Sequence, residues 1–389
     1  MTDSFALKNG QVLENNALQT KEINNLIYLL SCAVNETKPD AKYVENMDLD
    51  DVYHLALFHS VVSLTAFALE ELVTLPRKFD QAKKKAIRKN ALFDNERSRV
   101  YAQLSKEKIW HMSLKGIILK DYYPKFGMRE MSDNDILCDD SHMADVRRIM
   151  ENLGFQCTVY DERVDDTYTK SPVAFEMHRF LFDERESESF YLYYKNIKEK
   201  LLQDDKDEYE FYFTPEDFYV YMVAHEYKHY ISGGTGLRSL LDIYVYLNRW
   251  NGELDWQYIT CELDKLGIKA YERKTRTLAK AVFSGVTLGE EDREELLYYV
   301  TSGTFGTIER RKTNQLAKNL SGDDSKQSKQ QYIKNRLFLP MDVVKKEYPF
   351  FYHHKYLIPF LSVYRLFKAT FIKPKEVWAE YRRVNRFKY

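Results

Sequence analysis

Apolar residues recur at helical spacing through the N-terminal part of the chain, between residues 22 and 75. Such a period places apolar side chains on one face of each helix, so it predicts an N-terminal helical bundle with a break at residues 35–40. The next stretch, from Arg77 to Arg99, is strongly basic and predicts one long exposed helix that continues to Glu107. Residues 1–107 are therefore a predicted N-terminal helical region. The periodic apolar positions are Ile23, Leu26, Ile27, Leu30, Leu55, Leu57, Val61, Leu64, Phe67 and Leu69.

The pattern changes near Lys108 to short apolar runs separated by polar turns. These runs predict strands at residues 109–114, 134–138, 155–160 and 173–182, with an acidic turn between the last two. Helices are predicted at residues 116–123 and 141–153, the second with Ser141 as its N-cap and Gly154 at its end. Residues 108–213 thus predict a small mixed sheet backed by helices.

Beyond residue 213 the pattern returns to helix. Thr214 and Pro215, followed by acidic residues, are typical of a helix start, and helices are predicted at residues 215–230, 236–250, 256–266 and 270–283. We expect a helical domain over residues 214–320, then a linker at 321–330 that opens a basic helical C-terminal region ending at residue 389. The predicted fold class is α+β, a small mixed β-sheet domain embedded in a largely α-helical chain.

Composition narrows the possible partners and the compartment. The 58 Lys and Arg residues balance the 59 Asp and Glu residues, so net charge does not indicate a nucleic acid partner. The four cysteines are widely spaced without a C-x-x-C pair, which argues against disulfides and cysteine zinc sites and favours a reducing cytoplasm. No apolar run approaches the ~18 residues of a membrane span. We therefore expect a cytoplasmic protein.

The most informative motif is a pair of carboxylates at the start of the second predicted strand. Residues two apart on a strand share a face, so Asp133 and Asp135 point the same way, and Glu176 on a neighbouring strand can join them. Side-by-side carboxylates repel one another unless a cation lies between them, and Mg²⁺ (or Mn²⁺) binds such carboxylates together with phosphate oxygens. Gly116 follows a strand at the start of a helix, where backbone N–H groups favour phosphate, and Lys115 adds a positive charge.

The order of motifs along the chain resembles the uncharacterised nucleotidyltransferase family of the polymerase-beta-like superfamily. The resemblance runs from about residue 20 to residue 370 and rests on an ordered series of motifs. These are Lys115-Gly116, Tyr123-Pro124, Arg129-x-x-Ser132-Asp133-x-Asp135, Glu176-Met-His178, Ala224-His225 with His229, Gly236-Leu-Arg238 through Asp242, Leu254-Asp255-Trp256 and Gly303-x-x-Gly306.

This resemblance implies an enzyme that transfers a nucleoside monophosphate from an NTP to a hydroxyl acceptor with Mg²⁺, releasing pyrophosphate. Asp133 and Asp135 would be metal ligands, Glu176 the third carboxylate and a possible base, and Gly116 the phosphate-loop glycine. The acceptor, a small molecule or a protein, and the base of the NTP stay open. The residues expected to bind the nucleotide are Lys115, Gly116, Arg129, Ser132, His178 and Arg238. For His178 the alternative is a hydrogen bond to an acid, and for Arg238 it is helix packing.

Two residues depart from the family pattern. Ile117 follows Gly116 where the superfamily has serine, so a hydroxyl contact to phosphate is missing. Asn134 stands where an apolar residue is expected on the buried side of the strand, and its amide needs a partner.

Two further functions stay open. One is a catalytically inactive member of the fold that serves as a binding or regulatory module. The other is a zinc metalloprotease, because His225-Glu226-x-x-His229 matches the H-E-x-x-H signature. Lys228 argues against zinc, since it places a cation one turn from the metal. No third ligand stands out downstream of the motif, where Asp242 is the nearest carboxylate with helical placement.

Overall fold

The computed structural model describes residues 18–72, 74–161, 164–307, 310, 311, 314, 338, 339, 341, 344, 345 and 348–372. The chain divides into two compact units, Met1–Thr307 and Ile308–Tyr389. The first unit holds the predicted N-terminal helical region, the sheet and all four predicted helices of the helical domain. The predicted linker at 321–330 and the basic residues after 372 lie outside the described residues.

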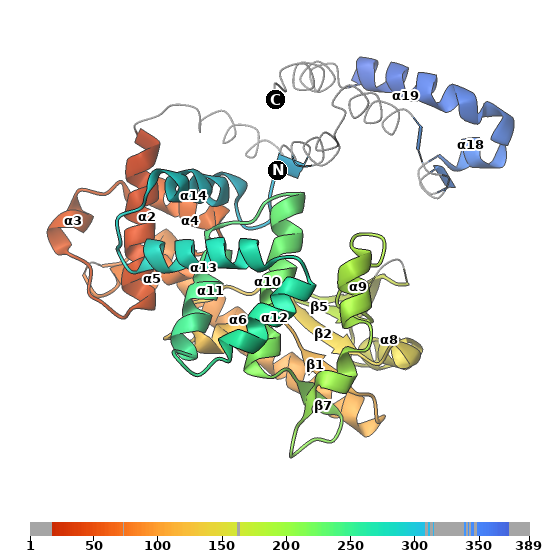
Figure 1. Ribbon diagram of the computed structural model, residues 1–389, viewed down its shortest axis with the longest axis horizontal. Coiled ribbons are helices and arrows are strands. Elements are labelled where there is room, and N and C mark those ends of the chain that lie inside the picture. The colour runs from red at the N-terminus through yellow and green to blue at the C-terminus, as the bar shows by residue number, and fades with distance from the viewer. Residues whose placement is uncertain are drawn as a thin grey trace. The chain divides into compact units, whose positions relative to one another are not determined.

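The N-terminal helices form a bundle, as predicted, in which α5 is buried on all sides. Figure 1 shows α2, α4 and α5 beside α11 and α13, away from the sheet. Asp48 caps α4 by accepting hydrogen bonds from the backbone N–H groups of Asp50 and Asp51. The helices are α2 (Leu18–Val34), α3 (Ala41–Glu45), α4 (Leu49–Phe58) and α5 (Val62–Leu69).

The long basic helix α6 (Arg77–Lys106) has the predicted length, but the prediction that it is exposed is wrong. Phe79, Phe93, Val100 and Leu104 are completely buried along one side of it. Three of these, Phe79, Phe93 and Val100, lie at multiples of seven residues, a spacing that keeps them on one stripe. The many basic residues between them obscure this stripe in the sequence, yet it is the stripe that packs α6 against the rest of the unit.

One mixed sheet of seven strands runs in the order β3-β4-β5-β2-β1-β7-β6. Strands β2 and β5 pair in parallel, as do β1 and β7, and the other neighbours are antiparallel. The strands are β1 (His111–Ser113), β2 (Asn134–Cys138), β3 (Gln156–Val159), β4 (Asp165–Lys170), β5 (Val173–His178), β6 (Leu202–Gln203) and β7 (Glu210–Tyr212).

The sheet is larger than predicted, because β4, β6 and β7 were not foreseen. The segment of β4 was read as part of an acidic turn, and Tyr168 is its only large apolar residue. Its pairing with β5 nevertheless extends over the whole strand, from Asp165 opposite His178 to Lys170 opposite Val173. The predicted helix at 116–123 is shorter, with α7 (Gly116–Leu119) followed by the 3-10 helix η1 (Lys120–Tyr122).

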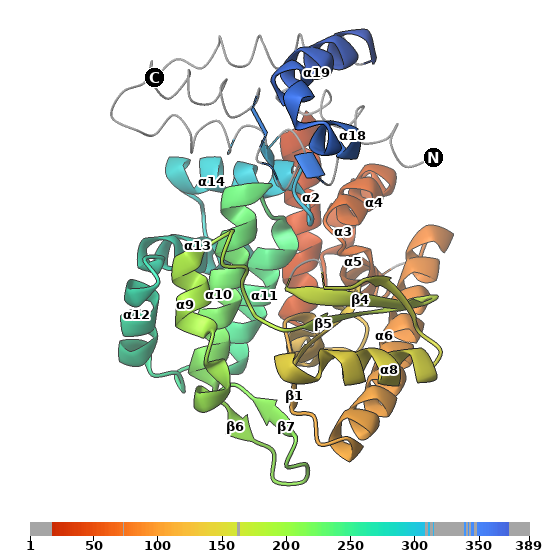
Figure 2. The same cartoon turned by 90° about the vertical axis from the view of Figure 1, so that its right-hand side faces the viewer.

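The two faces of the sheet have different environments. Ile136 of β2 and Phe175 and Met177 of β5 point to one face, where they pack in a hydrophobic cluster with α6 and α8 (Met143–Asn152). Figure 2 shows α8 crossing α6 on this side, where the two helices are in contact. Because side chains alternate along a strand, Asp135 and Glu176 point to the opposite face. The predicted N-cap Ser141 lies instead in the 3-10 helix η2 (Asp140–His142), which is capped by Asp139.

The C-terminal part of the first unit is helical, and the four predicted helices are confirmed to within two residues at each end. Thr214 caps α10 through a 3.1 Å hydrogen bond from the backbone N–H of Asp217, with Pro215 in the first turn. The helices are α9 (Glu188–Tyr194), which precedes β6, then α10 (Pro215–Ser232), α11 (Leu237–Arg249), α12 (Trp256–Lys265), α13 (Lys269–Phe283) and α14 (Glu290–Ser302). A short 3-10 helix, η3 (Ile197–Lys200), follows α9.

The second unit is mostly helical in the part that the structure describes. It contains α18 (Pro349–His353), the 3-10 helix η4 (Lys355–Leu357) and α19 (Ile358–Ile372). Across the described part of the chain, the search for a helix both long enough and apolar enough to pass through a membrane found none.

We expect Phe93→Ala to lower the free energy of unfolding by about 3–5 kcal/mol, because Phe93 is completely buried between α6 and the sheet and its truncation leaves a cavity. Chemical denaturation measures this change. Leu297→Ala on α14 is the control, since Leu297 is 53% exposed and its truncation should change stability little. Equal effects of the two substitutions would show that α6 does not bury this stripe.

Candidate active site

The parallel pairing of β2 and β5 brings the predicted acids together. Asp135 lies directly opposite Glu176 in the strand register, and Asp133 precedes Asp135 by two positions. We call Asp133, Asp135 and Glu176 the carboxylate cluster. Its members differ in exposure, since the side chain of Asp135 is 8% exposed and that of Glu176 is 34% exposed. The prediction that Glu176 joins the face of Asp135 is therefore confirmed.

Two basic side chains contact the buried carboxylate of Asp135. Lys115 Nζ lies 2.9 Å from Asp135 Oδ1, and His178 Nε2 lies 3.0 Å from the same oxygen. Because a carboxylate oxygen only accepts, His178 donates from Nε2, which leaves its buried Nδ1 without a hydrogen-bond partner in the described structure. Of the two roles left open for His178, the structure gives it the hydrogen bond to an acid.

Three potential metal ligands in this region approach closely. One ligand atom from each of Asp135, Glu176 and His178 lies within 4.8 Å of the others, and Asp133 is not a member of this group. Two carboxylates and an imidazole fit a divalent cation such as Mn²⁺, and the carboxylates alone fit Mg²⁺. The donor set is thus suited to the cation that the sequence predicts.

The neighbours of each acid shift its pKa in a different direction. Burial and the nearby charges of Asp135 and Asp133 raise the pKa of Glu176 to about 8. Burial also favours the neutral form of Asp135, but Lys115 and His178 outweigh it and hold the pKa of Asp135 well below its usual value. Burial and the charge of Asp135 raise the pKa of Asp133. At neutral pH the pair in register therefore holds one ionised and one protonated carboxyl group.

Two more cations influence Asp133. The positive charges of Lys89 of α6 and Arg238 of α11 oppose the rise in the pKa of Asp133 without reversing it. Neither forms an ion pair with a carboxylate in the described part of the chain: Lys89 donates to the carbonyl oxygen of Ser132 at 3.1 Å, and Arg238 lies 5.8 Å from the ring centre of Phe305. Burial lowers the pKa of both side chains. Their positive charges are available to an anion beside Asp133.

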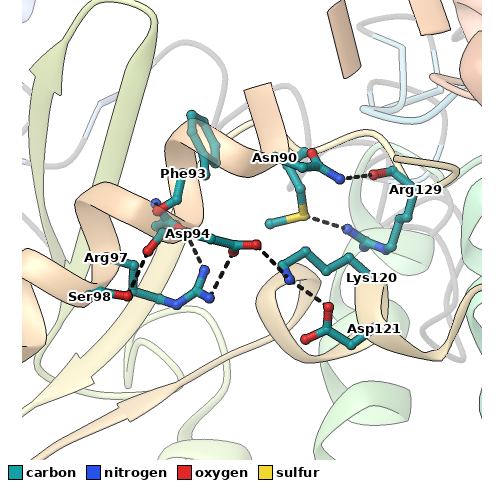
Figure 3. Close-up of polar contacts among 10 residues, drawn as sticks. Asn90, Phe93, Asp94, Arg97, Ser98, Lys120, Asp121 and Arg129 are labelled. Carbon is teal, nitrogen blue, oxygen red and sulfur yellow. Dashed lines mark hydrogen bonds and ion pairs between the residues drawn. The ribbon is translucent and has the colours of Figure 1, made fainter. Parts of the chain in front are cut away.

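Polar contacts from α6 hold the start of β2 in place. They also supply the partners that the buried amide of Asn134 needs. Its amide oxygen accepts from Arg97 at 3.3 Å, and its amide nitrogen donates to the carbonyl oxygen of Phe93 at 3.4 Å. Arg97 in turn pairs with Asp94 at 2.8 Å. Figure 3 shows Asp94 also reaching Lys120 of η1, at 3.2 Å. A polar residue at position 134 is therefore fully satisfied and ties β2 to α6.

A buried ion pair joins the sheet domain to α11. Arg129 donates from Nε and Nη2 to the two carboxylate oxygens of Asp242, each at 2.8 Å, and the hydroxyl of Tyr123 donates to Asp242 at 2.8 Å. Both ionic side chains are less than a tenth exposed. A Cβ on Gly116 would lie only 2.5 Å from Nη1 of Arg129, so glycine is needed there to admit the guanidinium. The predicted nucleotide contact of Arg129 stays a prediction, and in this structure the guanidinium is bound to Asp242.

The match to known proteins agrees with this geometry. The model of a family described as uncharacterised nucleotidyltransferase matches residues 45–284. This chain belongs to the uncharacterised nucleotidyltransferase family. No curated protein and no solved structure matches it. The family match contains the carboxylate cluster, Lys115, the Arg129–Asp242 pair and α10 to α13.

Two histidines of α10 lie within electrostatic reach of the carboxylate cluster. The Nε2 atoms of His225 and His229 lie 3.2 Å apart, and the charges of Lys115 and Asp135 act on both rings. Burial, Lys228 and Lys115 lower the pKa of His229 to about 4, and burial and Lys115 hold that of His225 well below its usual value. Both are neutral at pH 7. No third ligand completes a metal group with them among the described residues, so the zinc protease hypothesis lacks a ligand.

Glu226, the acid of that signature, belongs to a different environment. Its carboxylate accepts a hydrogen bond from the Thr235 hydroxyl at 3.1 Å, and its pKa is raised by burial. The charges of Arg238 and Asp242 act on it. In this nucleotidyltransferase, Glu226 thus lies among the polar residues at the start of α11.

We expect Asp242→Ala to destabilise the protein by about 3–5 kcal/mol, because it leaves the buried guanidinium of Arg129 without its partner. The double variant Arg129→Met with Asp242→Leu removes both charges and should recover most of that loss. Denaturation of the wild type, Arg129→Met, Asp242→Leu and the double variant gives the coupling energy. Additive effects of the two substitutions would contradict a direct ion pair.

Proposed function

We propose that this protein is a Mg²⁺- or Mn²⁺-dependent nucleotidyltransferase that transfers a nucleoside monophosphate from an NTP to a hydroxyl group of a small molecule or a protein. The observation that carries the proposal is the register of β2 and β5, which sets Asp135 opposite Glu176 with Asp133 two positions earlier. Membership of a nucleotidyltransferase family supports the reaction class. The charge balance of the chain gives no support to a nucleic acid acceptor.

The residues around the cluster suit a triphosphate. Lys115, Lys89 and Arg238 bring three positive charges to the carboxylates, and two of them, Lys89 and Arg238, form no ion pair in the described structure. Asp133, Asp135 and Glu176 would hold the cation, which would supply positive charge to stabilise the triphosphate and the departing pyrophosphate. Phosphate oxygens would then meet Arg238 and Lys89 on the side of Asp133.

The split in carboxyl pKa values suits proton transfer. In the reaction, the acceptor oxygen forms a bond to the α-phosphorus, the bond from that phosphorus to the bridging oxygen of the β-phosphate breaks, and the hydroxyl proton must leave. Glu176 has a pKa of about 8, so it would have to lose its own proton first, and in that ionised form it would be matched to accept the hydroxyl proton near neutral pH. Asp135, held ionised by Lys115 and His178, supplies a constant negative charge for the cation.

A second candidate is a catalytically inactive member of the family that serves as a binding or regulatory module. The observation that favours it is the ion pair of Lys115 with Asp135, since the ammonium group already neutralises the carboxylate that a metal would use. The two candidates differ in whether a divalent cation and an NTP displace this contact.

The deciding experiment is a thermal-shift and calorimetry panel of ATP, GTP, CTP and UTP with Mg²⁺ or Mn²⁺, followed by transfer assays with the NTP that binds. We expect one or more nucleotides to bind only with the cation. Asp133→Ala with Asp135→Ala should abolish that binding, whereas Asp140→Ala, an exposed acid just after the same strand, should leave it unchanged. Nucleotide binding that persists in the double variant would overturn the metal role. No nucleotide binding to the wild type, with or without a cation, would favour the second candidate.

The affinity for Mn²⁺ should depend on pH. Because the pKa of Glu176 is raised to about 8, this group is protonated below pH 8 and a cation must displace its proton. The Mn²⁺ affinity should therefore rise about tenfold per pH unit up to pH 8 and level off above it, as expected for release of one proton. Electron paramagnetic resonance counts free Mn²⁺ directly. Glu176→Gln should bind this Mn²⁺ more weakly and without the rise, and a pH-independent wild type would contradict Glu176 as a ligand.

A further inference from the structure

A second group of potential metal ligands lies at the other end of the central strands and on the opposite face of the sheet. It consists of His111 on β1, Glu210 on β7 and Asp207 in the turn before β7. His111 pairs with Cys138, the last residue of β2, whereas Asp135 is near the first. Cys138 and Asp135 are an odd number of positions apart, so they point to different faces. This group is therefore separate from the carboxylate cluster.

The strand register places the three ligands together. His111 is directly opposite Glu210 in the parallel pair of β1 and β7, so the two side chains share a face. A ring nitrogen of His111 and one carboxylate oxygen each of Asp207 and Glu210 all lie within 4.8 Å of one another. The charge of Asp207 also acts on His111.

The hydrogen bonding of His111 leaves one of its ring nitrogens free to bind a metal ion. Its Nδ1 lies 3.0 Å from the carbonyl oxygen of Ile109, and since a carbonyl only accepts, Nδ1 carries the proton. The other nitrogen, Nε2, is then a bare lone pair on a completely buried side chain, and no described residue is its partner. A histidine that donates one N–H to a backbone carbonyl while its other nitrogen is free has the arrangement of most metal-binding histidines.

The carboxylates of Asp207 and Glu210 have no cationic side chain in ion-pair contact among the described residues. Asp207 is oriented by the backbone N–H of Tyr209 at 2.9 Å and by the hydroxyl of Ser105. The side chain of Glu210 forms no hydrogen bond or ion pair with any described residue, and its pKa is raised by burial, Asp204 and Asp207, which outweigh the opposing charge of Arg97. His111 cannot compensate, because burial lowers its pKa and keeps the ring neutral. The group thus has two acids and a lone pair but no positive charge in contact with Glu210.

We propose that His111, Asp207 and Glu210 bind one divalent transition-metal ion of the Zn²⁺ or Mn²⁺ class, distinct from the cation of the carboxylate cluster. One imidazole and two carboxylates are a donor set for such ions rather than for Mg²⁺, and three protein ligands leave one position for water. The ion links β1 to the β6–β7 hairpin. Through Ser105, which contacts Asp207, it also connects that hairpin to α6. Because its ligands come from β1 and from the β6–β7 hairpin, the ion would stabilise the attachment of the hairpin to the sheet.

The test uses the full chain carrying Asp135→Asn and Glu176→Gln, so that the carboxylate cluster no longer binds metal. Co²⁺ is titrated in, its visible absorption reports an imidazole and carboxylate environment, and Zn²⁺ competition gives the Zn²⁺ affinity. We expect one equivalent of Co²⁺ to bind and Zn²⁺ to raise the melting temperature. Adding Glu210→Gln should weaken binding by at least about 10- to 100-fold, because a direct ligand matters no less than its supporting residues.

Glu208→Gln is the matched control, because Glu208 is an exposed acid of the same hairpin, and it should leave Co²⁺ binding unchanged. Asp207→Asn and His111→Gln should weaken binding as Glu210→Gln does. If His111→Gln does not fold, the two hairpin variants decide. No Co²⁺ absorption in the starting variant, or equal binding with Glu210→Gln and Glu208→Gln, would overturn the site. Neither result bears on the proposed transferase, whose cation ligands are already removed.

Discussion

Two carboxylates in register on neighbouring strands repel each other, and the structure around them compensates for that repulsion. At about 5 Å and an effective dielectric constant near 20, two full charges would cost roughly 3 kcal/mol. Lys115 and His178 both contact Asp135, at 2.9 and 3.0 Å. Of these two basic side chains, Glu176 has only the longer contact with His178, at 3.7 Å, among the described residues. Asp135 therefore keeps its charge and Glu176 keeps its proton. The asymmetry separates a permanent anion from a group that can exchange a proton at neutral pH, as in other paired carboxyl sites.

The position of this pair depends on segments far apart in the sequence. Asn134 holds β2 to α6 through Arg97 and the backbone of Phe93, so a polar residue on the buried side of the strand acts as an anchor. Arg129 and Asp242 are 113 positions apart, yet their bidentate pair fixes the loop before β2 against α11. α11 also carries Arg238, one of the cations beside Asp133. The ion pair thus sets the distance between the carboxylates and the charges proposed to bind phosphate.

Much of this fold follows from local sequence patterns, and the failures are equally physical. The strand at 134–138 was predicted from a short apolar run after a polar turn, and the helices from Thr214 onward from the helix start at Thr214-Pro215 and the Gly-containing turns between them. Strand β4 was missed because its buried residues include Asp166, whose charge is neutralised by Arg179 at 2.8 Å, a contact invisible in the local sequence. The burial of α6 was missed because its stripe is thin among basic residues.

The candidate site was also predictable from the sequence only in part. Alternation along a strand was enough to place Asp135 beside Glu176 once their strands were recognised. Nothing local in the sequence pairs Lys115 with Asp135 or Arg129 with Asp242, because an ion pair between distant residues leaves no periodic pattern. His111 gave no signal at all, since its partner Glu210 lies on a strand of three residues that the sequence did not predict.

The backbone at Lys115 connects these observations. Its φ of +44° is a region that side-chain-bearing residues rarely adopt, at a cost on the order of 1–3 kcal/mol, and glycine would remove that cost. A lysine here carries its ammonium group to Asp135 directly before the turn into Gly116. Without a cation, the ammonium group neutralises the acid. Beside a metal and a triphosphate, the same charge would face phosphate oxygens from the first turn of α7. The Lys115 ammonium group would therefore serve in both proposed states, which would account for a lysine at a position where glycine would remove the strain.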